Sequence, residues 1–152
     1  MPVTMEDVRR FLDADEVDYV AAATAFGSAA LPHLERFAQG PDVMLASKAV
    51  YLASLVGGAG ASGILATAAD SPQPPVRVAA ASGLRNLAEA AAGEVGPVAD
   101  RLLGDDDVGV RKVALASAAG LGTAEMTDRV RQVAENDPEP VLRDLANRLA
   151  QE

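Results

Sequence analysis

Apolar residues recur along much of the chain at steps of three and four, the spacing that places side chains on one face of an α-helix. In the last of these segments, Leu142, Leu145 and Leu149 would share a face, and similar segments begin at Val76 and Val110. Runs of β-branched and aromatic residues, which would indicate strands, are missing. The pattern therefore predicts an all-α protein.

A similar turn precedes each of the three segments, at residues 71–77, 105–111 and 137–143. Each turn ends in an aliphatic residue followed by an arginine, and the arginines recur at intervals of about 33 residues. Repetition at this period is typical of helical solenoids. Two earlier copies are less regular: one has Ala46 in the arginine position and Lys48 in an apolar position, and a weaker one begins at Val17.

Glycine and proline predict where the helices begin and end. Gly27, Gly57 and Gly122 follow the first helices of the pairs, where a left-handed residue often ends a helix. Pro32 and Pro97 stand near the expected starts of second helices. We therefore predict a single domain, 1–152, with these parts: an extra N-terminal helix over about 4–13, repeats over about 15–40, 41–70, 71–104 and 105–136, and a final helix over 138–151.

The recurring aliphatic-Arg-x-x-Ala pattern, with Gly-ended first helices and Pro-led second helices, resembles bacterial HEAT repeats over roughly residues 15–150. The resemblance implies a right-handed α-solenoid of about four to five helix pairs, whose second helices line a concave face. It also implies a structural ladder of hydrogen bonds between neighbouring repeats, formed by Arg77, Asp105, Arg111, Asp137 and Arg143.

Composition narrows the range of functions. The net charge of −9 opposes binding to phosphate backbones, so we expect no nucleic-acid partner. The absence of cysteine excludes thiol catalysis and thiolate metal sites, and with one histidine in the chain we expect neither a metal nor a cofactor. The segment 1–15 is acidic and no apolar run reaches spanning length. We therefore expect a soluble cytoplasmic protein without a membrane partner.

Three local patterns suggest chemistry, and each has a simpler explanation. Gly58, Gly60 and Gly63 spell GxGxxG, but the preceding segment fits the helical template, so we predict a flexible turn rather than a dinucleotide site. His33 has no nucleophile partner in its motif context and is expected to be a solvated surface residue. The acids at 105–107 suit a helix N-terminus better than a calcium loop. We predict no catalytic residues and no enzyme activity.

The second helices are expected to expose the residues that bind a partner. The segment 62–69 has no charged residue, which predicts either tight packing against neighbouring repeats or an apolar patch that contacts a partner. Outward positions on that segment are expected at Ala66, Thr67 and Ala69. The predicted partner-binding residues are His33, Arg36, Ala66, Thr67, Asp100, Arg101, Arg129 and Gln132.

These patterns favour a non-catalytic protein–protein interaction module, an adaptor or scaffold that binds an unidentified protein partner or a second copy of itself. Two alternatives come from relatives of the repeat family. One is a HEAT-like alkylpurine DNA glycosylase, which the acidity and the 3% aromatic content disfavour. The other is a bilin-lyase-like protein, disfavoured by the lack of cysteine and the few aromatic residues.

Overall fold

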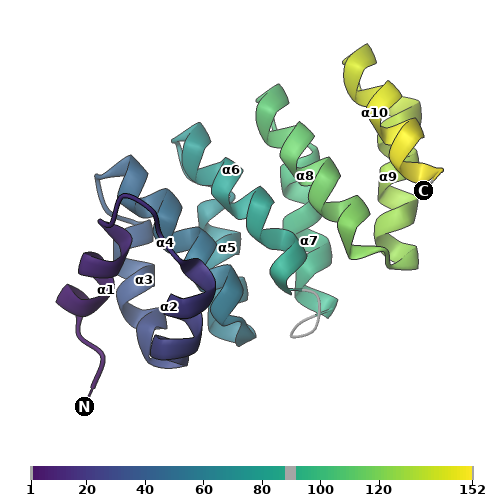
Figure 1. Ribbon diagram of the computed structural model, residues 1–152. Coiled ribbons are helices and arrows are strands. Elements are labelled where there is room, and N and C mark those ends of the chain that lie inside the picture. The colour runs from purple at the N-terminus through teal and green to yellow at the C-terminus, as the bar shows by residue number, and fades with distance from the viewer. Residues whose placement is uncertain (1, 88–91, 152) are drawn as a thin grey trace.

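The computed structural model describes residues 2–87 and 92–151, and every regular element within them is helical (Figure 1). The α-helices are α1 (Met5–Leu12), α2 (Tyr19–Phe26), α3 (Leu31–Ala38), α4 (Val43–Val56), α5 (Gly58–Ala68), α6 (Pro74–Gly83), α7 (Ala92–Leu103), α8 (Val108–Leu121), α9 (Ala124–Asn136) and α10 (Pro140–Ala150). Short 3₁₀ helices follow α2 and α6, at Gly27–Ala30 and Leu84–Leu87.

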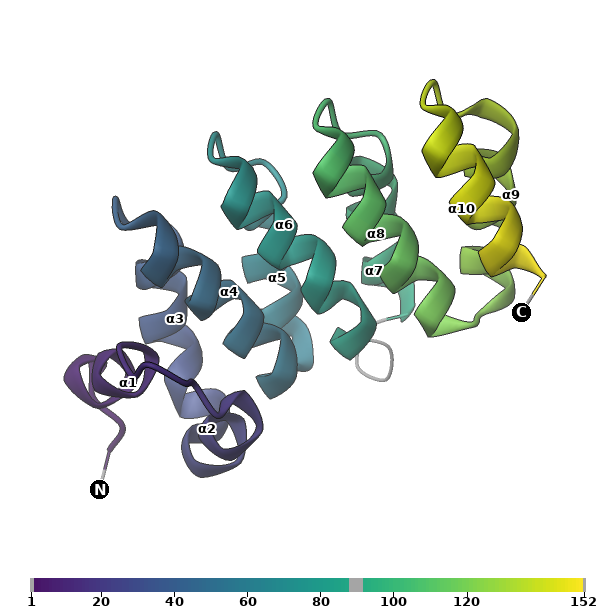
Figure 2. The same cartoon turned by 45° about the horizontal axis from the view of Figure 1, so that its top comes forward.

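The helices form an elongated stack with the two termini at opposite ends (Figures 1 and 2). The first helices α4, α6, α8 and α10 lie side by side in one layer, and α3, α5, α7 and α9 form a second layer behind them. The prediction of an all-α solenoid is confirmed. We call the layer of α3, α5, α7 and α9 the second-helix face.

Local sequence explains most of the helix ends. The side chains of Asp42 and Asp107 accept hydrogen bonds from backbone N–H groups in the first turns of α4 and α8, which satisfies donors that have no partner within the helix. Gly27, Gly57 and Gly122 end first helices with positive φ, as predicted. The acids before α8 do supply a cap, through Asp107.

The predicted flexible turn at the GxGxxG pattern is wrong. Gly57 and Gly58 have φ of +79° and +85°, and this pair of left-handed residues reverses the chain so sharply that α5 begins at once. Gly60 and Gly63 therefore lie inside the helix. The placement of Pro97 is also corrected, because α7 starts at Ala92 and the proline falls within it.

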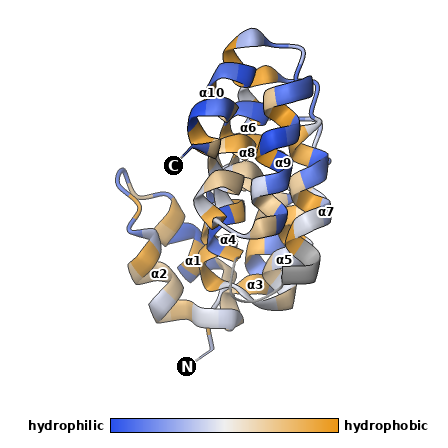
Figure 3. Ribbon diagram, turned by 90° about the vertical axis from the view of Figure 1, so that its right-hand side faces the viewer, coloured by the Kyte–Doolittle hydropathy of each residue, from blue (hydrophilic) through white to orange (hydrophobic). Residues whose placement is uncertain are grey.

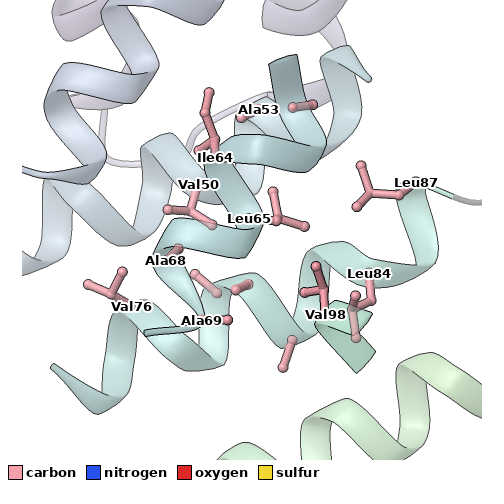
Figure 4. Packing of buried hydrophobic residues seen from close by; sticks show 14 of the residues in the cluster. Val50, Ala53, Ile64, Leu65, Ala68, Ala69, Val76, Leu84, Leu87 and Val98 are labelled. Carbon is pink, nitrogen blue, oxygen red and sulfur yellow. The ribbon is translucent and has the colours of Figure 1, made fainter. Parts of the chain in front are cut away.

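The core consists mainly of small and medium aliphatic side chains, which lets neighbouring helices approach closely (Figure 4). One close approach is at Gly83 on α6, where an added Cβ would lie 2.7 Å from the Cβ of Ser54 on α4. Ser117 occupies the same place on α8, and its hydroxyl is buried with no hydrogen-bond partner among the described residues. The contact between α4 and α6 therefore has no room for a side chain at position 83. At the equivalent position 117, the contact between α6 and α8 has room for the side chain of serine.

The N-terminal helix is tied to the solenoid by two long-range hydrogen bonds. Lys48 on α4 donates from Nζ to the carbonyl of Leu12 at 2.9 Å, next to the end of α1. The Nε2 of His33 lies 2.9 Å from the carbonyl of Val3. The expectation that His33 is a solvated residue is thus wrong, because the N-terminal segment packs over it. The bond to Leu12 also explains why a lysine stands at position 48, where the repeat template has an apolar residue.

Candidate protein-binding site

The turns between helix pairs carry two similar ion pairs. Arg77 donates from Nε and Nη2 to the carboxylate of Asp105, at 2.9 and 3.3 Å. Arg111 makes the same bidentate pair with Asp137, donating from Nε and Nη2 to its carboxylate at 3.1 and 3.4 Å. Each arginine also donates from Nη1 to the backbone carbonyl that begins its own turn, and Arg143 makes this bond to Asp137. The structure therefore brings the predicted ladder residues together in a repeating pattern.

Asp105 is the most highly bonded of these acids. Its side chain is 1% exposed and accepts from Arg77, from Arg101 and from the backbone N–H of Asp107. Burial raises the pKa of this carboxyl, but the hydrogen bonds from the Asp107 N–H and from Arg77, with the nearby positive charge, outweigh burial and leave the pKa lowered. Asp105 therefore stays ionised at neutral pH.

Further ion pairs link neighbouring helices of the second-helix face. Arg129 on α9 donates to both carboxylate oxygens of Asp100 on α7, with 3.0 Å from Nη2 to Oδ2. These hydrogen bonds lower the pKa of Asp100 and raise that of Arg129. Arg101 on α7 bonds to Asp70, at the end of α5, at 2.9 Å. Three of the predicted partner-binding residues are thus already paired within the chain.

The first of two related grooves lies between α7 and α9 and has a volume of about 510 Å³. We call it the α7–α9 groove. Its walls include the two ion pairs just described, Arg111 with Asp137 and Arg129 with Asp100, and it also takes in Gln132. The guanidinium groups of Arg111 and Arg129 therefore line this groove.

The second groove has a volume of about 500 Å³ and lies between the C-terminal ends of α3 and α5 and the turns that lead into α4 and α6. We call it the α3–α5 groove. Its floor is apolar and includes Ile64, Ala68 and Val76, which Figure 4 shows among the buried side chains. Its polar lining residues are Glu35, Gln39, Thr67, Asp70, Ser71 and Gln73.

The two grooves occupy equivalent places in the repeat but differ in charge. Counted from the N-cap residues of the adjoining helices, Ala46 stands where Arg111 stands, and Gly63 stands where Arg129 stands. Glu35 corresponds to Asp100, and no ion pair reaches it within the described part of the chain. The α3–α5 groove thus keeps an acid and lacks both arginines.

Next to this groove lies an exposed surface on α5 without charge. Gly63, Ala66 and Thr67 are exposed, so the interpretation of this helix as tightly covered by neighbouring repeats is wrong for these positions. Ala69, also expected to face outward, is instead buried at the end of the helix. The hydropathy colouring in Figure 3 shows more blue on α9 and α10 than on α2 and α5. We call Gly63, Ala66 and Thr67 the α5 patch.

The predicted partner-binding residues therefore divide into two groups. Arg36, Ala66, Thr67 and Gln132 are exposed and make no side-chain hydrogen bond or ion pair among the described residues, whereas His33, Asp100, Arg101 and Arg129 already have partners in the chain. Sequence reasoning missed the groove residues, although Ala46 in the arginine position of the repeat was a signal. The missed lining residues include Gln39, Gly40, Pro41, Ile64, Ser71 and Val76.

In residues 2–87 and 92–151, no three His, Asp or Glu side chains are grouped so that they could hold a metal ion. No helix in the same ranges is long and apolar enough to cross a membrane. Neither observation identifies a ligand for the α3–α5 groove or the α7–α9 groove.

Comparison with known proteins shows likeness in structure. The chain matches no protein-family model and no curated protein sequence. One similar solved structure is the complex of CpcE and CpcF of phycocyanin lyase from Nostoc sp. PCC7120, with a TM-score of 0.69, 21% identity, and coverage of 88% of this chain and 86% of the other. Another is a homology model of the full-length AP-3 complex, with a TM-score of 0.69, 15% identity, and coverage of 95% of this chain but 30% of the other.

These likenesses establish a HEAT-like helical solenoid, and at such low identity they establish the fold alone. They also correct one prediction. We expected no enzyme activity, but a chain of the same fold forms part of a lyase complex, which contradicts a non-enzyme assignment. Membership of the bacterial HEAT-repeat proteins in particular stays a prediction.

Proposed function

We propose that the chain is a helical interaction module that binds a protein partner through the second-helix face, centred on the α5 patch. The observation that carries the proposal is the combination of an exposed, uncharged helix surface with an adjoining groove of about 500 Å³. Stacked helix pairs offer an extended surface to partners, and exposed apolar patches on such surfaces often mark contacts. The similar structures are themselves protein complexes, which supports the proposal.

The charge of the chain indicates the kind of partner. With a net charge of −9, association with a basic protein would be favoured by electrostatic steering and would weaken as salt is added. A second copy of this acidic chain would be opposed by the same field. The homodimer therefore ranks below a basic partner protein.

The proposal can be tested with a charge placed in the α5 patch. We expect Ala66→Lys to retain helicity by circular dichroism but to lose proteins that the unaltered chain captures from native lysate, quantified by mass spectrometry. Ala21→Lys on α2 adds the same charge at an exposed position outside the second-helix face and should capture them normally. Equal capture by both variants would contradict the proposal, and a solution mass measurement would detect self-association.

A second candidate is a bilin-lyase-like function, supported by the likeness to the phycocyanin lyase complex. It is tested by mixing the chain with phycocyanobilin and passing the mixture through a gel-filtration column. Coloured pigment that co-elutes with the chain and has a shifted visible spectrum would support it. Elution of all pigment at the position of the small molecule would dismiss it.

A further inference from the structure

The α3–α5 groove has nearly the volume of its C-terminal counterpart but lacks that counterpart's lining arginines. In the α7–α9 groove, Arg111 comes from the adjoining first helix and Arg129 from the second helix. At the equivalent positions of the earlier repeat stand Ala46 and Gly63, neither of which carries a charge or a hydrogen-bonding side chain, and neither lines the α3–α5 groove. The C-terminal repeat thus shows an arginine paired with the acid that corresponds to Glu35.

We infer that the α3–α5 groove accepts an arginine side chain from the partner protein, whose guanidinium pairs with Glu35 as Arg129 pairs with Asp100 in the wall of the α7–α9 groove. The inference rests on the proposed function and specifies the chemistry of the partner. Glu35 would be the main acceptor, as Asp100 is for Arg129. The methylene groups of the arginine would lie against the apolar floor at Ile64 and Ala68.

Three properties of the groove suit this occupant better than a wholly apolar one. Glu35 is an exposed acid with no ion pair among the described residues, so binding a cation would not have to break an existing contact. Gln39 and Gln73 are exposed at the rim and could bond to the backbone of an extended partner segment. The overall negative charge would also attract a basic segment.

The chain allows a variant that supplies its own arginine at the position equivalent to Arg129. An added Cβ at Gly63 would have no atom within 4 Å, and the residue does not have positive φ, so Gly63→Arg can be accommodated within α5. The new guanidinium would compete for Glu35 with the arginine of a partner. Gly120→Arg is the matched control, because Gly120 is also an exposed helical glycine with no atom within 4 Å of an added Cβ, and it lies on α8.

The experiment pans a random-peptide library displayed on phage against the full chain and measures the affinity of synthesised hits. We expect enriched peptides to carry an arginine beside an aliphatic residue. Replacing that arginine with citrulline, which has the same shape without the charge, should weaken binding about tenfold or more. Gly63→Arg and Glu35→Gln should weaken it similarly, whereas Gly120→Arg should bind like the unaltered chain.

The outcomes separate this inference from the proposed function. Enriched peptides that lack arginine, or that bind Gly63→Arg as tightly as Gly120→Arg, would overturn the arginine-binding groove. If such peptides still lose affinity for Ala66→Lys, the second-helix face keeps its proposed role. If the library gives no binder, or only peptides indifferent to every one of these changes, both proposals are contradicted.

Discussion

Between α4 and α6 the chain relies on close packing, whereas between α6 and α8 it adds an ion pair largely removed from solvent. At the first junction Gly83 brings the helices so near that Ser54 leaves no space for a Cβ, and Ala46 and Ser71 occupy the positions of the missing ion pair. At the second, Arg77 and Asp105 pair across the turn. Equivalent junctions in one solenoid are thus stabilised by different interactions.

If the proposed function holds, this difference lets one irregular repeat serve both stability and binding. Ion pairs in the C-terminal half line the groove between α7 and α9 and use polar groups that a partner could otherwise bind. Close apolar packing in the N-terminal half stabilises the junction from the opposite layer and leaves the α3–α5 groove accessible. Irregularity in the repeat therefore marks the surface where we expect binding.

The largest effect should follow from removing the acid of the ladder. Asp105→Ala leaves Arg77 without its carboxylate in a poorly solvated place, and we expect a loss of about 3–5 kcal/mol in the free energy of unfolding, measured with urea. Ser71→Ala is the control at the equivalent position before α6, where no arginine is bound by the side chain. It should change stability by about 0.5 kcal/mol or less, and equal losses would contradict the comparison.

Acid should weaken the same junction by protonation. Because the folded-state pKa of Asp105 is lowered, its contribution to stability is complete above the ordinary pKa of an aspartate, about 3.9, and is lost as the pH falls through the lowered value. Urea unfolding of the unaltered chain from pH 7 to pH 3 should show this decline. In Asp105→Asn the decline should be shallower, and an unchanged slope would argue against a role for this carboxylate.

A smaller effect is expected from the packing of the first junction. Gly83→Ala introduces a Cβ 2.7 Å from that of Ser54, and relieving this overlap should cost about 1–3 kcal/mol of unfolding free energy. Ser117→Ala tests the same place at the next junction and removes a buried hydroxyl to which no described residue offers a hydrogen bond. It should be neutral or slightly stabilising. Similar losses in both variants would show that the two contacts do not differ as described.

The smallest effect should come from restoring an ion pair to the α3–α5 groove. Gly63→Arg and Gly120→Arg both remove a helical glycine, which should stabilise each protein by about 0.5–1 kcal/mol in thermal unfolding. Only the first variant can pair with Glu35, and an exposed pair should add about 0.2–1 kcal/mol. A Gly63→Arg protein no more stable than the Gly120→Arg control would indicate that Glu35 is not reached.

The sequence was most informative where one residue determines local geometry. Arg77 and Arg111 stood out because each follows a similar turn, and Gly57 because a helix end there needs a left-handed residue. Gly58 was misplaced in a flexible turn because two successive glycines can also reverse the chain with no intervening loop. Periodicity alone could not show how the last turn of α5 buries Ala69.

The groove was harder to predict because it depends on side chains far apart in the sequence. Glu35 and Val76 line the same space only because four helix ends meet there. The interaction of His33 with Val3 could not be anticipated either, since it depends on where the N-terminal segment packs. The sequence did show two relevant features, the absence of charge on α5 and the alanine at position 46 in place of the repeat's arginine.

The Arg–Asp pairs also bear on how such a protein can grow. The segment 105–136 contains both an acid that receives an arginine from the preceding unit and Arg111, which binds the acid of the following one. Tandem duplication of this segment would therefore produce copies already equipped to join one another. A duplicated 41–70 segment would carry Ala46 in place of the donor and would lack this connection. Lengthening of the array by gene duplication is thus expected to begin from its C-terminal units.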